Sequence, residues 1–219
     1  MRAARLTLLI AAAFAVGARG QAGPSAGAVI VDFTNPGISP SHWTLTLHRD
    51  GSGHFHSERG DPSASQEFDA PNVDREIQLT ADYAEHVFQM AQRHNWFNEE
   101  CESHLKVAFQ GWKKLSYKGP EGQGTCTFNY SQDKEIQALG DSLVGVAETV
   151  REGARLEMLL QHDRLGLDRE TEYLTDGAKD GRMQQICAIR EILERLAEDP
   201  EVLDRVRKRA RFLLAHAGS

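Results

Sequence analysis

Cysteines and histidines are the residues of this chain whose spacing could support chemistry. The chain has three cysteines, Cys101, Cys126 and Cys187. A bond between Cys101 and Cys126 would close a loop of about 25 residues and stabilise the fold by about 3 kcal/mol. The alternative is two unpaired thiols, with Cys126 as a small core residue. Cys187 falls in a helical apolar pattern, which predicts a buried free thiol.

His94, Cys101 and His104 form a loose cluster that could bind a metal ion. The spacing of Cys101 and His104, with two residues between them, occurs among zinc ligands. A fourth ligand is not evident, and a Cys101 that forms a disulfide could not serve. The cluster is therefore a candidate metal site only if Cys101 does not form the disulfide.

His48, His54 and His56 lie on the outer face of a predicted β-hairpin. Imidazoles that share a face can bind a transition metal. The simpler interpretation is a solvated polar face.

Other motifs point to no cofactor. Gly119, Gly122 and Gly124 join two predicted strands, do not open a helix and lack the lysine and hydroxyl of a phosphate loop. The chain contains neither Gly-x-Ser-x-Gly nor His-Glu-x-x-His. The sequence therefore predicts no cofactor and assigns no catalytic residue.

Residues 1–20 have the layout of a secretory signal peptide. Arg2 and Arg5 precede an apolar run from Leu6 to Val16, and small residues stand near position 20. No cysteine follows that run, so a lipoprotein anchor is not supported. We expect a secreted or periplasmic protein with no transmembrane span in its mature chain.

Export would make the chain more acidic. Residues 1–20 hold three of the 25 basic residues and no acidic one, which leaves 22 against 32 acidic residues, a formal charge of −10. This balance disfavours nucleic acid as a partner, because nucleic acid is itself a polyanion. It likewise argues against a general binder of anionic membranes.

The first part of the mature chain is rich in turns and strands. Residues 21–42 read as a linker or extended lead-in, in which only AVIVDF at positions 28–33 could form a strand. Residues 43–57 alternate apolar and polar positions around a turn at Asp50. A three-residue loop from Asp50 to Ser52 pairs Leu47 with Phe55 and keeps the apolar side chains on one face.

A second hairpin is predicted over residues 105–130. Val107, Phe109, Leu115 and Tyr117 have the same parity, with a bulge or bend expected at Gly111. We expect Tyr117 to pair with Cys126 and Leu115 to pair with Phe128. This register leaves residues 119–124 as the loop.

Helical patterns surround and follow this hairpin. A short strand over 75–79 leads to Thr80, a good helix N-cap, and then to a helix that ends near residue 95. Ser131 is expected to cap a long helix to about residue 161. Residues 164–181 are expected to be irregular or short helices, and residues 182–197 and 200–217 are two helices that form an αα-hairpin.

The succession LTLHRDGSGHFH, QLTADYAEHVFQMAQRHNWF and VAFQGWKKLSY…CTFNY resembles small secreted or periplasmic bacterial domains of unknown function. The resemblance covers about residues 43–147. It implies an exported address and a layout of hairpin, short strand and helix, but no catalytic residue.

The sequence predicts an α+β fold, in which an antiparallel sheet from two hairpins is packed by two helices and followed by a helical C-terminal section. We divide the chain into a signal peptide (1–20), a lead-in (21–42), an α+β domain (43–161) and the helical section (162–219). The leading functional hypothesis is a non-enzymatic module that binds another protein or a cell-envelope component. The alternatives are a secreted hydrolase with a site near His94, His104 and the central hairpin, and weak metal binding by the surface histidines.

Overall fold

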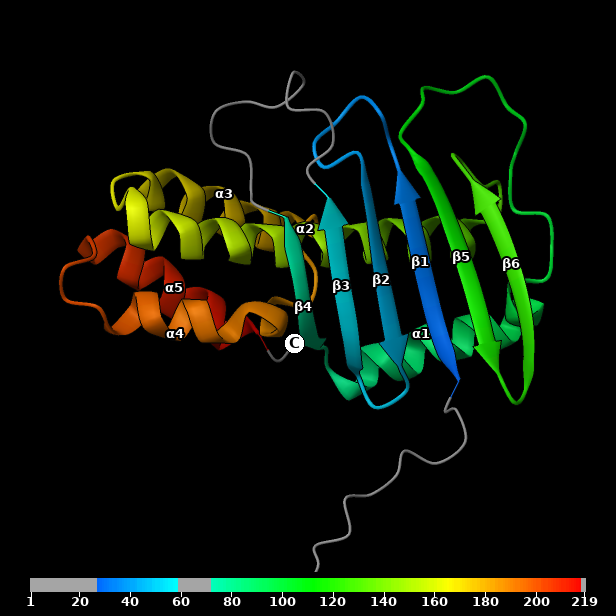
Figure 1. Cartoon of the computed structure of the whole chain (residues 1–219), viewed down its shortest axis with the longest axis horizontal. Coiled ribbons are helices and arrows are strands. Elements are labelled where there is room, and N and C mark those ends of the chain that lie inside the picture. The colour runs from blue at the N-terminus through cyan, green and yellow to red at the C-terminus, as the bar shows by residue number, and fades with distance from the viewer. Residues whose placement is uncertain (1–26, 59–71, 218–219) are drawn as a thin grey trace, which may run out of the picture.

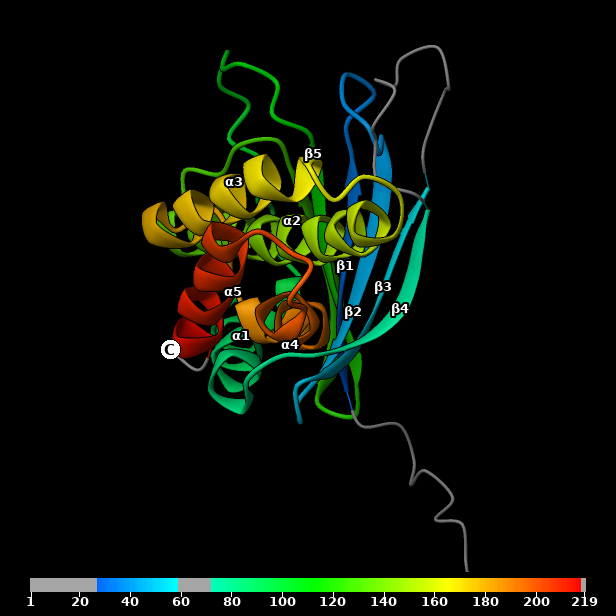
Figure 2. The same cartoon turned by 90° about the vertical axis from the view of Figure 1, so that its left-hand side faces the viewer.

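A computed structural model describes residues 27–58 and 72–217, and the expected signal peptide lies outside these residues. The fold is α+β, as predicted: six antiparallel strands form one sheet, and the helices lie on one side of it (Figures 1 and 2). No helix of the described ranges is long and apolar enough to cross a membrane.

The sheet is built around its first strand. The strands are β1 (Ala28–Thr34), β2 (His42–His48), β3 (Ser52–Glu58), β4 (Val73–Gln78), β5 (Trp112–Gly119) and β6 (Gly122–Phe128). Their order is β4-β3-β2-β1-β5-β6, so β1 pairs with β2 on one side and with β5 on the other. The expected lead-in over residues 21–42 therefore contains a strand in the middle of the sheet.

Alternation of side chains gives the sheet one buried and one polar face. Val29, Val31 and Phe33 of β1 are buried, and they pair with Leu47, Leu45 and Trp43 of β2. The intervening positions of β1 and β2 point to the opposite face and are mostly polar: Asp32 and Thr34 in β1, next to Ala28 and Ile30, and His42, Thr44, Thr46 and His48 in β2. A period of two residues with one solvated face is typical of an antiparallel sheet covered on one side.

Both predicted hairpins form with the predicted faces, but both registers were wrong by two residues. Leu45, rather than Leu47, pairs with Phe55, so the first loop begins one residue earlier than expected. In the second hairpin Leu115 pairs with Cys126 and Tyr117 pairs with Gly124. The turn there is the tight Pro120-Glu121 pair between Gly119 and Gly122, rather than a six-residue loop. A shift by two residues keeps every side chain on its face, so apolar parity alone could not detect it.

Two helices cover the inner face of the sheet. Helix α1 (Ala81–Arg93) begins at Thr80, whose hydroxyl accepts a hydrogen bond from the Tyr83 backbone as the predicted N-cap. Helix α2 (Lys134–His162) begins at Asp133, whose carboxylate caps two backbone N–H groups. The predicted cap at Ser131 was wrong by two residues, and its hydroxyl instead accepts from the Asp133 backbone.

Helix α2 joins two hydrophobic cores. Its buried residues up to Ala154 pack with the sheet, and those from Leu156 onward pack with the C-terminal helices. The second core therefore begins inside α2, upstream of the expected boundary at residue 162.

The C-terminal section is more regular than expected. Residues 164–181 contain one 15-residue helix, α3 (Gly166–Asp180), which ends at Gly181 in the left-handed conformation. The predicted αα-hairpin is present, but its helices are shorter than the expected 182–197 and 200–217. The 3-10 turn η3 (Ile186–Ile189) leads into α4 (Arg190–Glu198), against which α5 (Asp204–His216) packs. Cys187 lies in η3 as a free thiol, half-buried rather than fully buried.

Candidate functional site

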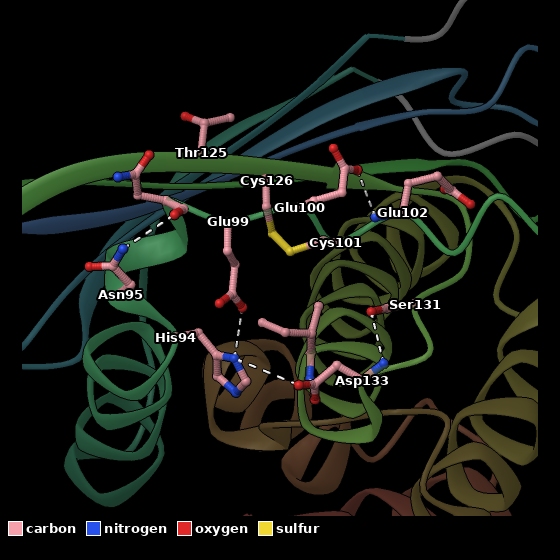
Figure 3. The surroundings of a disulfide bond; sticks show 12 residues. His94, Asn95, Glu99, Glu100, Cys101, Glu102, Thr125, Cys126, Ser131 and Asp133 are labelled. Atoms are coloured by element: carbon pink, nitrogen blue, oxygen red, sulfur yellow. Dashed lines mark hydrogen bonds and ion pairs between the residues drawn. A yellow bond between two sulfur atoms is a disulfide. The ribbon is translucent and has the colours of Figure 1, made fainter.

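The segment between η2 (Asn95–Phe97) and β5 is an irregular loop, residues 98–111, that is fixed to the end of β6. Cys101 of this loop is bonded to Cys126 of β6, with a Cα–Cα distance of 5.6 Å (Figure 3). The predicted disulfide is thus present, and both cysteines are buried. It closes a loop with a sequence separation of 25 residues.

Asn129 provides the second attachment of the loop. Its side-chain oxygen accepts a hydrogen bond from the Gln110 backbone at 2.7 Å, and its side-chain nitrogen donates to the Ala108 carbonyl at 3.2 Å. Its backbone N–H donates to the Glu102 carboxylate at 2.6 Å. One buried residue therefore fixes the loop at three points: its side-chain amide satisfies two backbone groups that have no strand partner, and its own backbone N–H binds Glu102.

The Glu102 carboxylate is part of this attachment. Desolvation opposes its ionisation, but backbone N–H groups of Asn129 and His104 donate to it and hold its pKa below the ordinary value. Glu102 is therefore an anion at neutral pH and forms charge-assisted hydrogen bonds at the base of the loop.

Gly111 lets the far end of the loop turn into β5. Its φ is +114°, a conformation that other residues rarely adopt, and a Cβ placed there would lie 2.4 Å from the ring of Phe33. The bend predicted at this position is thus present, and the loop backbone packs directly on β1.

Four large apolar side chains project from this loop and the first residue of β5 into solvent. Leu105, Val107, Phe109 and Trp112 are 53%, 42%, 49% and 45% exposed. The sequence placed Val107 and Phe109 on the buried face of a strand, which was wrong because β5 begins only at Trp112. We call these four residues the apolar loop surface.

The apolar loop surface lies at one end of the sheet, where the loop extends beyond the strands (Figures 1 and 2). The rings of Phe109 and Trp112 meet edge to face, with centroids 6.0 Å apart. The turn between β1 and β2 lies beside it, since Asn35 donates a hydrogen bond to the Gln110 carbonyl. That turn adds Ile38, which is 43% exposed.

His94 lies near the disulfide but has only carboxylates as its ion-pair partners. Its Nδ1 is 2.9 Å from Glu99 and 3.9 Å from Asp133, and its Nε2 is 3.3 Å from Glu135 (Figure 3). The side chain is 9% exposed. This arrangement fixes the imidazole between α1 and the start of α2, which is a structural role.

The candidate ligands His94, Cys101 and His104 do not form a metal site. Cys101 is consumed by the disulfide, and His104 is exposed beside Glu100, 3.9 Å away. Among the residues that the structure describes, no group of three or more His, Cys, Asp or Glu could hold a metal ion.

The histidines of the first hairpin lie on the face of the sheet away from the helices, as predicted, and two of them, His54 and His56, pair with acids rather than with each other. His54 and His56 both contact Asp74 of β4, at 2.7 and 3.2 Å, and His56 also contacts Glu58 at 3.3 Å. These hydrogen bonds, to Glu58 first and then to Asp74, raise the pKa of His56. His48 is at the end of β2, at the pairing position of Ala28.

The most perturbed titratable group is one that the sequence did not single out. Burial, followed by a hydrogen bond to Glu170 and the negative charge of that residue, raises the pKa of Glu152 to about 9. Glu170 in turn pairs with Arg155 at 3.0 Å. A signal was available, because Glu152 occupies the buried stripe of α2 between Thr149 and Leu156.

Several cavities of the described ranges lie between helices. One of about 610 Å³ lies between the end of α2 and α4, one of about 560 Å³ between α2 and the turn at residues 180–184, and one of about 420 Å³ between α1 and α2. None of these three is lined by Glu152, His94 or the apolar loop surface. The cavities therefore bring none of these candidate groups together.

Comparisons with known proteins leave the function to be argued from the structure. No family model matches the chain, and no curated protein matches it.

Replacement of both bonded cysteines, Cys101→Ser with Cys126→Ser, should lower the free energy of unfolding by about 3 kcal/mol, because the unfolded chain gains the freedom of the opened loop. Denaturant unfolding measures this loss, and Cys187→Ser is the matched control. Alkylation should modify one thiol in the native protein and three after reduction. Modification of three thiols before reduction would refute the bond.

Glu152→Gln should stabilise the protein increasingly as the pH rises. The folded state holds a proton on Glu152 that the unfolded state loses above about pH 4.5, so the wild type loses stability between about pH 4.5 and 9. The variant should gain on the order of 2–3 kcal/mol at pH 8 and little at pH 4.5. Thermal unfolding across this range measures the difference, with the exposed Glu191→Gln as control. An equal gain at both pH values would contradict the buried proton.

Proposed function

We propose that this protein is a non-enzymatic module that binds another protein or a cell-envelope component through the apolar loop surface. The observation that carries the proposal is the exposure of Leu105, Val107, Phe109 and Trp112 on a backbone that is fixed from within. Large apolar side chains that gather on an exposed surface are typical of interaction sites.

A loop whose backbone is already fixed can bind a partner more tightly than a flexible loop with the same side chains. Fully burying one such side chain contributes about 1.5–3 kcal/mol, so a partner that buried the half-exposed surfaces of all four would gain several kcal/mol. Part of this gain is usually lost when a flexible loop becomes ordered on binding. The disulfide and Asn129 have already ordered this loop, which reduces that cost.

Export supports a partner outside the cytoplasm. The segment 1–20 has the pattern of a signal peptide, and a structural disulfide is stable in an oxidising compartment. A secreted or periplasmic location is therefore part of the proposal.

The alternatives find less support in the geometry. The hydrolase hypothesis needs a nucleophile or an activated water beside a histidine, whereas His94 is surrounded by Glu99, Asp133 and Glu135. Metal binding by the surface histidines needs convergent ligands, whereas His54 and His56 converge on Asp74.

The double variant Leu105→Gln with Phe109→Gln should fold normally and lose binding to isolated cell envelopes by at least tenfold. Each lost contact removes about 1 kcal/mol or more. Leu165→Gln, which changes a leucine that is 79% exposed in the helical section, is the matched control. Co-sedimentation with envelopes measures the effect.

A photo-crosslinking amino acid at Val107 tests contact directly. It should form adducts with envelope material in cells, whereas the same group at Leu165 should not. Equal adduct yields at the two positions, or unchanged sedimentation of the double variant, would overturn the proposal.

A further inference from the structure

From the position of the apolar loop surface beside unpaired lysines, we propose that its partner is a phospholipid surface, into which Leu105, Phe109 and Trp112 insert. This inference rests on the proposed function and names the partner class. The argument concerns the charge around the surface, the shape that presents it and the residue types within it.

The segment that carries the surface has a charge opposite to that of the whole chain. Residues 103–119 contain four lysines and no aspartate or glutamate. Lys113 is buried beside Asp141, but Lys106 and Lys114 are exposed and make no ion pair within the described ranges. Most arginines of the helical section, by contrast, have acidic partners. Two unpaired lysines beside apolar side chains are complementary to lipid phosphates above acyl chains.

Acidic residues that lie far from the surface oppose this local attraction only weakly. Electrostatic interactions are screened beyond about 8–10 Å at physiological ionic strength. The acidic end of the loop, with Glu99, Glu100 and Glu102, lies near the disulfide (Figure 3). The Glu102 carboxylate also accepts hydrogen bonds from the backbone N–H groups of Asn129 and His104.

The shape suits a broad surface better than a protein groove. The loop extends beyond the end of the sheet (Figures 1 and 2). The register of β1 with β5 places Thr34 beside Trp112, so Ile38 in the turn after β1 lies at the same end. Among the residues that the structure describes, both loops thus lie where one planar boundary could contact them.

The residue types are those of a membrane interface. Tryptophan is enriched at the level of lipid headgroups, and phenylalanine and leucine are typical of the inserted face of peripheral proteins. Trp112 leads directly into Lys113 and Lys114, so the aromatic ring and the exposed charge of Lys114 lie on the same face of β5.

Vesicle co-sedimentation tests the inference, with vesicles of phosphatidylcholine and phosphatidylglycerol in a 3:1 ratio. The wild-type protein should bind at sub-millimolar lipid, and the tryptophan emission should shift to shorter wavelength. Leu105→Gln with Phe109→Gln should weaken binding at least tenfold, and Trp112→Phe should abolish the shift while binding is retained. Leu165→Gln should bind like wild type. Because the double loop variant keeps the N-terminal segment, its loss of binding would exclude attachment through that segment.

Lys106→Gln with Lys114→Gln separates charge from insertion. Its substitutions should weaken binding several-fold on the mixed vesicles and leave binding to pure phosphatidylcholine unchanged.

Absence of binding at millimolar lipid, or equal binding by the wild type and all variants, would overturn the inference. A concentration-dependent dimer that the double loop variant dissociates would also overturn it, in favour of a second copy as partner. If vesicles fail but Val107 still crosslinks to a protein in cells, the lipid inference fails and the proposed function stands.

Discussion

The attachment of the 98–111 loop to the end of β6 is the constraint on which the apolar loop surface depends. The loop has no strand partners. Without this attachment its backbone would take its hydrogen bonds from water, and its apolar side chains would collapse onto the protein. The Cys101–Cys126 bond fixes one end of the loop, and the Asn129 side chain forms hydrogen bonds with the backbone of Ala108 and Gln110. The loop is consequently ordered while its large side chains remain in solvent.

The rest of the fold supplies a rigid base for this loop. Strand β1 joins the first hairpin to the second, so the sheet is continuous from β4 to β6. Helix α2 crosses from the core beneath the sheet to the core of the C-terminal helices. Because buried cores are closely packed, the end of β6, whose Cys126 and Phe128 belong to the core beneath the sheet, cannot shift independently of that core.

The sequence predicted which face of each strand is buried better than it predicted which residues pair across strands. The period of two residues correctly identified the buried sides of both hairpins, because burial selects parity, but it could not distinguish registers that differ by two residues. The same signal failed over residues 105–109, where Leu105, Val107 and Phe109 alternate as in a strand and yet have no strand beside them. The tether at Asn129 has no sequence pattern, since it depends on a residue some 20 positions away.

Charged residues in the core were equally hard to foresee. A buried glutamate such as Glu152 is rare, and the sequence marks it only by its place in an apolar helical stripe. The disulfide was easier, because an odd cysteine count and an expected signal peptide left few pairings to consider.

Hydroxyl-radical footprinting of the free protein in solution tests the central claim most directly, because it reports the exposure of individual side chains. Our account predicts that Phe109 is oxidised about as fast as the exposed Tyr173, and far faster than the buried Phe128. Protection of Phe109 at the level of Phe128 would show that the loop collapses when no partner is bound, and would contradict the account.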